Sequence, residues 1–360
     1  MTGPHPAVAA TRHAVRSHLA DCAPGALVLV ACSGGADSLA LAAAAAFESR
    51  KFPVWIGAVI VDHGLQEGSD LVCREAAEQC RRLGLDPVVT RRVRVSASGG
   101  GGPEARARES RYEVFEEVMA ECGASSTWLG HTRDDQAEQV LLGLVRGSGT
   151  RTLSGIPRRR PPYERPLLDL PRRDTVEACR AQGLTPWADP SNEDQTFLRN
   201  RVRRLLRSAT EELGPGLPAA LARTAALARE DADALDLFTA QARRAMGPWP
   251  WPVSAVAGHP TAVRGRLWRS LAAEEGCPEV GSRHVLAVDA LVVGWRGQGP
   301  VALPGGRWFG RRDGLVGFTD RSGREWAVGG DREGSPDDGP VSSASAAPAE
   351  GLDGPATEEK

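Results

Sequence analysis

Residues 26–38 read ALVLVACSGGADS, and this stretch decides the fold. An apolar, β-branched run ends at Cys32, and an Ala- and Leu-rich helical pattern begins a few residues later. The turn between them consists of Ser33, Gly34, Gly35, Ala36, Asp37 and Ser38. Glycines let a backbone approach an anion closely, and the free N–H groups at a helix start favour negative charge. The stretch predicts a phosphate site at the carboxyl end of a buried strand.

Two interpretations of this turn compete. A strand-to-helix turn capped by Ser or Asp would suffice for an isolated Gly-Gly pair. In the functional interpretation the hydroxyls of Ser33 and Ser38 add hydrogen-bond donors, and Asp37 holds a Mg²⁺ on a departing pyrophosphate. The position between a strand and a helix fits both interpretations, so the choice depends on the whole pattern S-G-G-x-D-S.

The region around the turn alternates apolar runs with helical patterns. This alternation is typical of βαβ units and predicts an α/β domain with a doubly wound parallel sheet. The predicted strands are 26–32, 54–62, 87–95 and 126–130, and the predicted helices are 38–49, 67–83, 104–121 and 134–146.

The composition of the chain divides it into three parts. Residues 1–207 form the predicted catalytic domain, which includes a proline-rich basic connector at 158–173. A smaller, mainly helical domain follows at 208–330, with helices at 217–246, 261–275 and 282–293 and a small hairpin within 300–318. Residues 331–360 are rich in Ser, Pro, Gly, Ala and acids, which predicts a disordered acidic tail.

Charge and residue usage exclude several classes of protein. The net charge is -2, but residues 331–360 hold eight acidic and two basic residues, so the remainder carries +4. Lys51 and Lys360 are the only lysines, and neither follows a glycine-rich loop, which excludes a Walker A site. The seven cysteines form no CxxC pair, and no run of about 18 apolar residues occurs. A soluble, cytoplasmic protein is expected.

Three further segments carry candidate site residues. Arg108 and Arg111 share one face of the 104–121 helix and suit a phosphate, although a solvated helical face would look the same. At the start of the next helix, acids can cap the first turn, bind a metal or accept an amine. These acids are Asp134, Asp135 and Glu138. Residues 199–207 contain five arginines, which fit either RNA phosphates or a solvated helical face. The candidate RNA contacts are Arg199, Asn200, Arg201 and Arg203.

These motifs resemble two nested families. The pattern S-G-G-x-D-S resembles the PP-loop of the ATP-pyrophosphatase superfamily, and V-D-H-G at 61–64 resembles a segment that places His63 in the nucleotide pocket. The run H-x-x-D-D-Q-A-E at 131–138 is similar to that of the lysidine synthase family. So are R-P-L-L at 165–168 and D-P-S-N at 189–192, the latter followed by F-L-R-N-R-V-R. Thr132 departs from the pattern, because the family often has a second His there.

The resemblance implies an ATP-dependent ligase that uses Mg²⁺. ATP would adenylate the C2 oxygen of the wobble cytidine in the CAU anticodon of tRNA(Ile), and the amine of free L-lysine would then displace AMP. The sequence leaves the oligomeric state open, a homodimer included. Two rivals remain: another PP-loop enzyme such as a tRNA thiolase, which normally needs paired cysteines or a cluster, and a noncatalytic RNA-binding protein with a decayed loop.

Overall fold

The computed structural model divides the chain into two compact units, Met1–Leu237 and Phe238–Lys360. The structure describes residues 3–62, 64, 68–93, 103–147, 149–278 and 280–327. The division falls inside a long helix, α9 (Leu217–Met246), whereas the sequence predicted a boundary after residue 207. Residues 331–360, predicted to be a disordered tail, lie outside the described residues.

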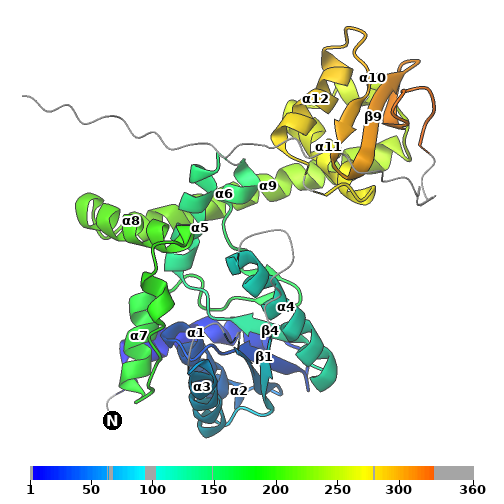
Figure 1. Ribbon diagram of the computed structural model, residues 1–360. Coiled ribbons are helices and arrows are strands. Elements are labelled where there is room, and N and C mark those ends of the chain that lie inside the picture. The colour runs from blue at the N-terminus through cyan, green and yellow to red at the C-terminus, as the bar shows by residue number, and fades with distance from the viewer. Residues whose placement is uncertain are drawn as a thin grey trace, which may run out of the picture. The chain divides into compact units, whose positions relative to one another are not determined.

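The first unit is built on a six-stranded sheet in the order β3-β2-β1-β4-β6-β5 (Figure 1). All neighbouring pairs are parallel except β5 and β6. The strands are β1 (Leu27–Ala31), β2 (Trp55–Asp62), β3 (Val88–Arg92), β4 (Ser126–Leu129), β5 (Arg159–Arg160) and β6 (Tyr163–Glu164). The chain proceeds from β1 outward to β3 and then returns to β4 on the other side of β1. Such a switch point leaves a crevice at the carboxyl ends of the strands. The predicted doubly wound parallel sheet is confirmed.

Helices cover both faces of this sheet. The described helices of the first unit are α1 (Pro6–Ala20), α2 (Ala36–Ser49), α3 (Ser69–Leu83), α4 (Pro103–Cys122), α5 (Arg133–Val145), α6 (Thr150–Leu153), α7 (Arg172–Ala181) and α8 (Leu198–Leu213), together with the first part of α9. Alternate strand residues point to opposite faces. Val28 and Val30 pack with α1, α2, α3 and α7, whereas Leu29 packs with Val118 and its neighbours on α4. The Ala-rich α2 is buried nearly all round, which fixes the turn that precedes it.

The second unit combines three helices with an antiparallel sheet in the order β7-β10-β9-β8. Its elements are β7 (Trp251–Pro252), α10 (Val253–Ala257), α11 (Thr261–Glu274), α12 (Ser282–Val293), β8 (Val301–Leu303), β9 (Arg307–Arg312) and β10 (Leu315–Thr319). Trp251, Trp268 and Phe309 form the centre of its core. The sequence predicted only a hairpin in this region, and the structure extends it to four strands.

Part of the predicted connector at 158–173 joins the first sheet. β5 and β6 lie within it, and Arg172 begins α7. Two short 3-10 turns complete the described chain, at Pro190–Glu193 and Pro304–Gly306. Within the described residues, no helix is long and apolar enough to cross a bilayer.

Candidate active site

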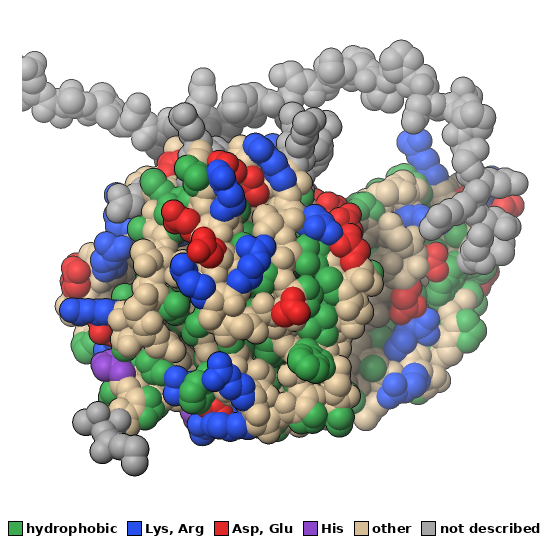
Figure 2. Space-filling model, turned by 90° about the horizontal axis from the view of Figure 1, so that it is seen from below, with side chains coloured by type: hydrophobic (Ala, Val, Ile, Leu, Met, Phe, Trp, Pro, Cys, Tyr) green, Lys and Arg blue, Asp and Glu red, His purple; other side chains and the backbone are tan. Residues whose placement is uncertain are grey.

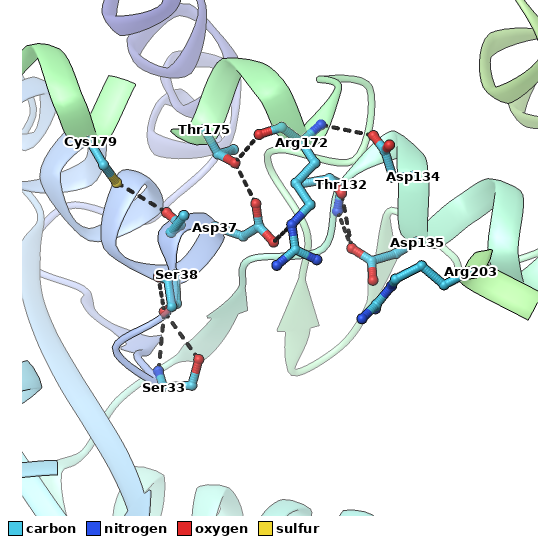
Figure 3. A network of polar contacts seen from close by, with 12 residues as sticks. Ser33, Asp37, Ser38, Thr132, Asp134, Asp135, Arg172, Thr175, Cys179 and Arg203 are labelled. Carbon is cyan, nitrogen blue, oxygen red and sulfur yellow. Dashed lines mark hydrogen bonds and ion pairs between the residues drawn. The ribbon is translucent and has the colours of Figure 1, made fainter. Parts of the chain in front are cut away.

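The predicted phosphate site is the turn between β1 and α2 (Figure 3). Gly34 has φ +81°, a conformation that side chains rarely adopt. Gly35 is the N-cap of α2 and has no side chain to occupy the first-turn amides. The hydroxyl oxygens of Ser33 and Ser38 lie 3.3 Å apart, and Ser38 Oγ accepts a hydrogen bond from the Ser33 amide at 3.2 Å. Ser38 Oγ in turn donates to the Gly35 carbonyl at 2.9 Å, so the turn presents the first-turn amides and the Ser33 hydroxyl at a helix start, which suits an anion.

The end of β4 packs directly against this turn at Gly130. A Cβ on Gly130 would lie 3.0 Å from the carbonyl carbon and oxygen of Asp37 and from the amide nitrogen of Ser38. These are backbone atoms, so a side chain at position 130 would displace the start of α2. Sequence analysis did not select Gly130, although a glycine at the end of a predicted strand was the available signal.

Asp37 points from the first turn of α2 toward α7 (Figure 3). Thr175 donates a hydrogen bond to Asp37 Oδ1, and Arg172 Nε lies 3.8 Å from Oδ2. Burial raises the pKa of Asp37 to about 6, and the charges of Asp135 and Asp134 also raise it, while Arg172 and Thr175 act in the opposite direction. A cation beside these carboxylates would offset the free-energy cost of burying their negative charges, so the donor chemistry fits Mg²⁺.

Helix α7 clamps both the turn and the start of α5. The Arg172 amide donates to Asp134 Oδ2 at 2.8 Å, so Asp134 caps the N-terminus of α7. Cys179 Sγ donates to the Ala36 carbonyl at 3.3 Å, and the Trp187 amide, just beyond the helix, donates to the Gly34 carbonyl at 2.9 Å. Sequence analysis missed this clamp, because it assigned 158–173 to a connector and selected nothing in α7.

The acids of α5 meet the arginines of α8. Asp135 Oδ2 accepts hydrogen bonds from Thr132 N and Oγ1 at 2.8 and 3.0 Å, and the bond from the Thr132 amide is one half of a capping box at the start of α5. Its other oxygen lies 2.9 Å from Arg199 Nη2. Glu138 is 2% exposed, and its two oxygens lie 2.9 Å from Arg199 Nε and 2.7 Å from Arg203 Nε. The predicted substrate-binding acids and two predicted RNA-binding arginines thus neutralise one another.

The other two predicted RNA contacts on α8 differ in their surroundings. Asn200 donates from Nδ2 to the carbonyls of Ser191 and Asp194, both at 2.8 Å. This side chain therefore holds the turn at 191–194. Arg201 is exposed, and in the described part of the chain its guanidinium has no hydrogen bond or ion pair. Arg201 is available to a partner, whereas Asn200 is committed to the protein.

The predicted arginine face of α4 lies near these groups. Arg108 Nη2 donates to the hydroxyl of Tyr112 at 3.2 Å. Part of Arg111 is exposed, yet its guanidinium lies deep enough that burial lowers its pKa, and the charges of Arg108 and Arg199 lower it further. Positively charged side chains therefore gather at this position.

Two side chains, the buried Arg165 and the neutral His131, lie beside this positive cluster. Burial lowers the pKa of His131 to about 4, and the charges of Arg165, Arg199 and Arg108 contribute, while Asp135 opposes them. Nδ1 of His131 and Nε of Arg165 are buried without a hydrogen-bond partner. Leaving a buried polar group unpaired costs about 1–3 kcal/mol, which an oxygen of a bound anion or base would recover.

The structure brings Asp37 together with Asp134 and Asp135, as their mutual charge effects show. His63, predicted to line the nucleotide pocket, lies outside the described residues. The catalytic and binding roles of the predicted residues stay predictions. Gly130, Arg172 and Thr175 also belong to this site, although none of them was selected from the sequence.

Comparison with known proteins identifies the family. A family model described as a PP-loop domain matches residues 10–209. The tRNA(Ile)-lysidine synthase of Thermobifida fusca is 49% identical over 321 residues, covering 88% of this chain and 98% of that protein. The enzyme of the same name from Streptomyces coelicolor is 46% identical over 337 residues, covering 84% and 95%.

A solved structure supports the fold independently. The U34-tRNA thiolase NcsA from Methanococcus maripaludis superimposes with a TM-score of 0.52 at 18% identity, covering 61% of this chain and 78% of that one. This likeness concerns the fold alone. The family model and the relatives of nearly equal length show that the chain belongs to the PP-loop family and, within it, to the tRNA(Ile)-lysidine synthases.

Proposed function

We propose that this protein ligates lysine to the wobble cytidine of tRNA(Ile) with a CAU anticodon, at the expense of ATP. The C2 oxygen of the base attacks the α-phosphorus, and pyrophosphate leaves. The ε-amine of lysine then attacks C2, loses a proton, and AMP departs with the former C2 oxygen. The product, lysidine, pairs with A instead of G, so the codon changes from AUG to AUA. Adenylation makes the reaction possible because it turns a poor leaving oxygen into a good one.

The observation that carries this proposal is the turn at 33–38 with Asp37 facing the acidic start of α5. The first-turn amides and the Ser33 hydroxyl are suited to the phosphates of ATP. Asp37 would hold a Mg²⁺, which neutralises charge on the departing pyrophosphate. No three His, Cys, Asp or Glu side chains of the described chain converge on a metal site, so phosphate oxygens would supply the other ligands.

The positive cluster offers the complement to the reacting phosphate and base. Arg108 and Arg111 stand on α4, and Arg165 and His131 add buried donors that lack partners. Fixed donors of this kind stabilise negative charge that develops in a transition state, because they need no reorganisation. We assign Arg108 and Arg111 to this role.

The lysine site would use the acids of α5. Asp135 and Glu138 carry the negative charge that an ammonium group requires, with Asp134 beside them. Arg199 and Arg203 now hold two of these acids, so lysine binding would require the arginines to share or release them. Released arginines would be free for RNA phosphates, together with the exposed Arg201. Asn200 would contribute by holding the preceding turn.

The decisive experiment incubates the purified protein with ATP, labelled L-lysine and a tRNA(Ile) transcript bearing CAU, followed by nucleoside analysis. We expect labelled lysidine, with one AMP and one pyrophosphate per lysine incorporated. A matched transcript with U in place of the wobble C should accept no lysine. Pyrophosphate release that leads to a sulfur-containing nucleoside, or tRNA binding without AMP formation, would overturn the proposal. ATP and tRNA are cytoplasmic, so we place the reaction in the cytoplasm. The molecular mass of the same preparation in solution tests for a homodimer.

A further inference from the structure

An open cavity of about 540 Å³ lies in the first unit, outside the site described above. Residues of helices α6 and α9, of strand β5 and of the segment between α6 and β5 line it. Its charged lining consists of Arg151, Arg158, Arg159, Arg160, Arg229 and Asp233. Pockets of this size bind small ligands when they are mostly apolar, whereas five guanidiniums suit phosphate oxygens.

Three of these arginines have acidic partners, most of which are exposed. Arg151 pairs with Asp233 at 2.7 Å and with Asp236, which are 61% and 49% exposed. Arg158 pairs with Asp169, which is 74% exposed, and Arg159 pairs with Asp21, which is 57% exposed. Arg159 also lies 3.4 Å from Glu164, which is 20% exposed. Exposed pairs contribute about 0–1 kcal/mol, so a doubly charged phosphate can replace such a carboxylate at small cost.

Among the described residues, no acid lies within ion-pair distance of the other two arginines. Arg160 is exposed, and no hydrogen bond or ion pair of its side chain occurs in the described chain. Arg229 donates to the carbonyls of Ser154 and Gly155, the latter at 3.0 Å, so its charge faces only neutral groups at bonding distance. Burial lowers the pKa of Arg229, and the charges of Arg151 and Arg165 lower it further, against Asp233. Two of the five arginines of the cavity are therefore available to a phosphate without displacement of an acid.

The wall of the cavity is rigid and is tied to the active-site helix. Gln136 of α5 accepts from the Ile156 amide at 2.6 Å and donates to the Ile156 carbonyl at 3.1 Å. Gly155 has φ +64°, and a Cβ there would lie 2.5 Å from Gln136 Oε1. Buried Arg165 donates to the Pro157 carbonyl at 3.0 Å. Gln136 directly follows Asp135. The residue that holds the cavity wall and the acids of the candidate active site therefore lie on one turn of α5.

By contrast, charge is mixed on the face of the molecule that Figure 2 draws. Lys and Arg side chains are interspersed there with Asp and Glu. Weak, mixed charge of this kind gives no directed attraction for a polyanion. The arginine cavity is a local concentration of donors on a chain whose net charge is -2.

We propose that this cavity binds backbone phosphates of the tRNA and so helps to hold the substrate RNA beside the active site. The inference rests on the proposed function for the identity of the RNA. Phosphate could also come from a nucleotide, but the turn at 33–38 already offers a site for ATP phosphates in the same unit. RNA, with many phosphates along one strand, suits a second site that is open to solvent.

The test measures the affinity of the full chain for the tRNA(Ile) transcript across a series of salt concentrations. Arg160→Ala should weaken binding several-fold and reduce the salt slope by about 1, because one phosphate contact is lost. Asp233→Asn removes the acid that lines the cavity, so it should tighten binding. Arg81→Ala, an exposed arginine on α3, is the matched loss of charge and should change binding little. All three residues are exposed, which keeps the fold intact.

The KM for ATP at saturating tRNA separates the two sources of phosphate. If Arg160→Ala raises that KM and leaves tRNA affinity unchanged, the cavity serves a nucleotide and the proposal is wrong. Equal tRNA affinity for the wild type, Arg160→Ala and Asp233→Asn would also overturn it. Should the wild type form no lysidine while the variants shift tRNA binding in the expected opposite directions, the proposed reaction fails but the RNA site stands.

Discussion

At the scale of single residues, the carboxylate of Asp37 gives the most direct test of the proposed chemistry. We expect Asp37→Asn to lower ATP-dependent pyrophosphate release by roughly 100-fold or more, since charge neutralisation at the phosphate would be lost. Affinity for tRNA should stay within a few fold, because Asp37 contacts only Thr175 and Arg172 in the described chain. Asp70→Asn, at an exposed pair on α3, is the control for lost charge. Normal turnover in the Asp37 variant would remove this carboxylate from the chemistry.

His131 makes a prediction about pH and stability. Its folded pKa of about 4 lies below the ordinary value of 6.5, so the unfolded chain takes up a proton that the folded chain refuses. Stability is unaffected above pH 6.5 and is lost as the pH falls from 6.5 to 4. At pH 5 the loss is roughly 2 kcal/mol.

Denaturant unfolding at pH 7.5 and pH 5 measures this effect. His131→Asn should lose less stability between the two pH values than the wild type does, whereas His13→Asn, an exposed histidine on α1, should behave like the wild type. The same pH dependence in all three proteins would show that His131 does not resist protonation.

At the scale of elements, helix α7 positions Asp37 through one hydroxyl. Thr175 is fully buried, and its one hydroxyl proton lies within hydrogen-bond reach of Asp37 Oδ1 and of the Arg172 carbonyl. Thr175→Val keeps the shape and removes the donor. A hydrogen bond to a charged group contributes about 1.5–3 kcal/mol, so kcat/KM for ATP should fall by roughly 10-fold or more.

A purely structural role for Thr175 would predict a different pattern. We expect Thr175→Ser to restore kcat/KM, while tRNA affinity and unfolding remain near wild type in the Ser variant. Thr185→Val is the matched control, because Thr185 bonds to Gln79 through its backbone atoms and not through its hydroxyl. If Val and Ser variants lose activity in proportion to lost stability, the hydroxyl does not position Asp37.

The meeting of α5 and α8 gives a stability prediction. Glu138 is buried between Arg199 and Arg203, and removing one charge of a buried network typically costs about 3–5 kcal/mol. Glu138→Gln should therefore lower the free energy of unfolding by several kcal/mol. Glu211→Gln, on the exposed side of α8, should cost less than about 0.5 kcal/mol. If Glu138→Gln and Glu211→Gln are equally stable, Arg199 and Arg203 do not pair with Glu138 in solution.

The sequence could predict the elements whose own periodicity decides their structure. The strands β1, β2, β3 and β4 and the helices between them were predicted close to their observed bounds, because long apolar runs and amphipathic patterns are local signals. The prolines around 161–171 kept β5, β6 and α7 from being predicted. β6 forms by pairing with β4, β5 forms by pairing with β6, and α7 forms by packing on α2. β7 is two residues long and pairs with a strand more than sixty positions later.

The site divides in the same way. Ser33 to Ser38 form one continuous motif, so their pattern indicated a phosphate turn directly. The pairing of Asp135 with Arg199 joins positions 64 apart, and local spacing carries no information about it. The clamp from Thr175 onto Asp37 likewise spans 138 positions. Such contacts follow from the order of strands in the sheet, which only the folded chain supplies.

At the scale of the whole molecule, charge along the chain should modulate RNA binding. Residues 331–360 carry eight acidic and two basic residues, and without them the charge changes from -2 to +4. A tethered acidic segment competes with RNA phosphates for arginines wherever it can reach them. Removing 331–360 should therefore tighten binding of the tRNA(Ile) transcript several-fold at 50 mM salt.

The salt dependence distinguishes competition by charge from any other effect of the tail. The Debye length is about 10 Å at 0.1 M salt and about 3 Å at 1 M, so an electrostatic advantage of the shortened chain must shrink as salt rises. A full-length variant with the eight acids replaced by Asn or Gln should bind like the shortened chain, and one with the same residues in scrambled order should bind like the wild type. An advantage that persists unchanged at high salt, or that the neutral tail does not reproduce, would mean that the acids of residues 331–360 do not compete with RNA.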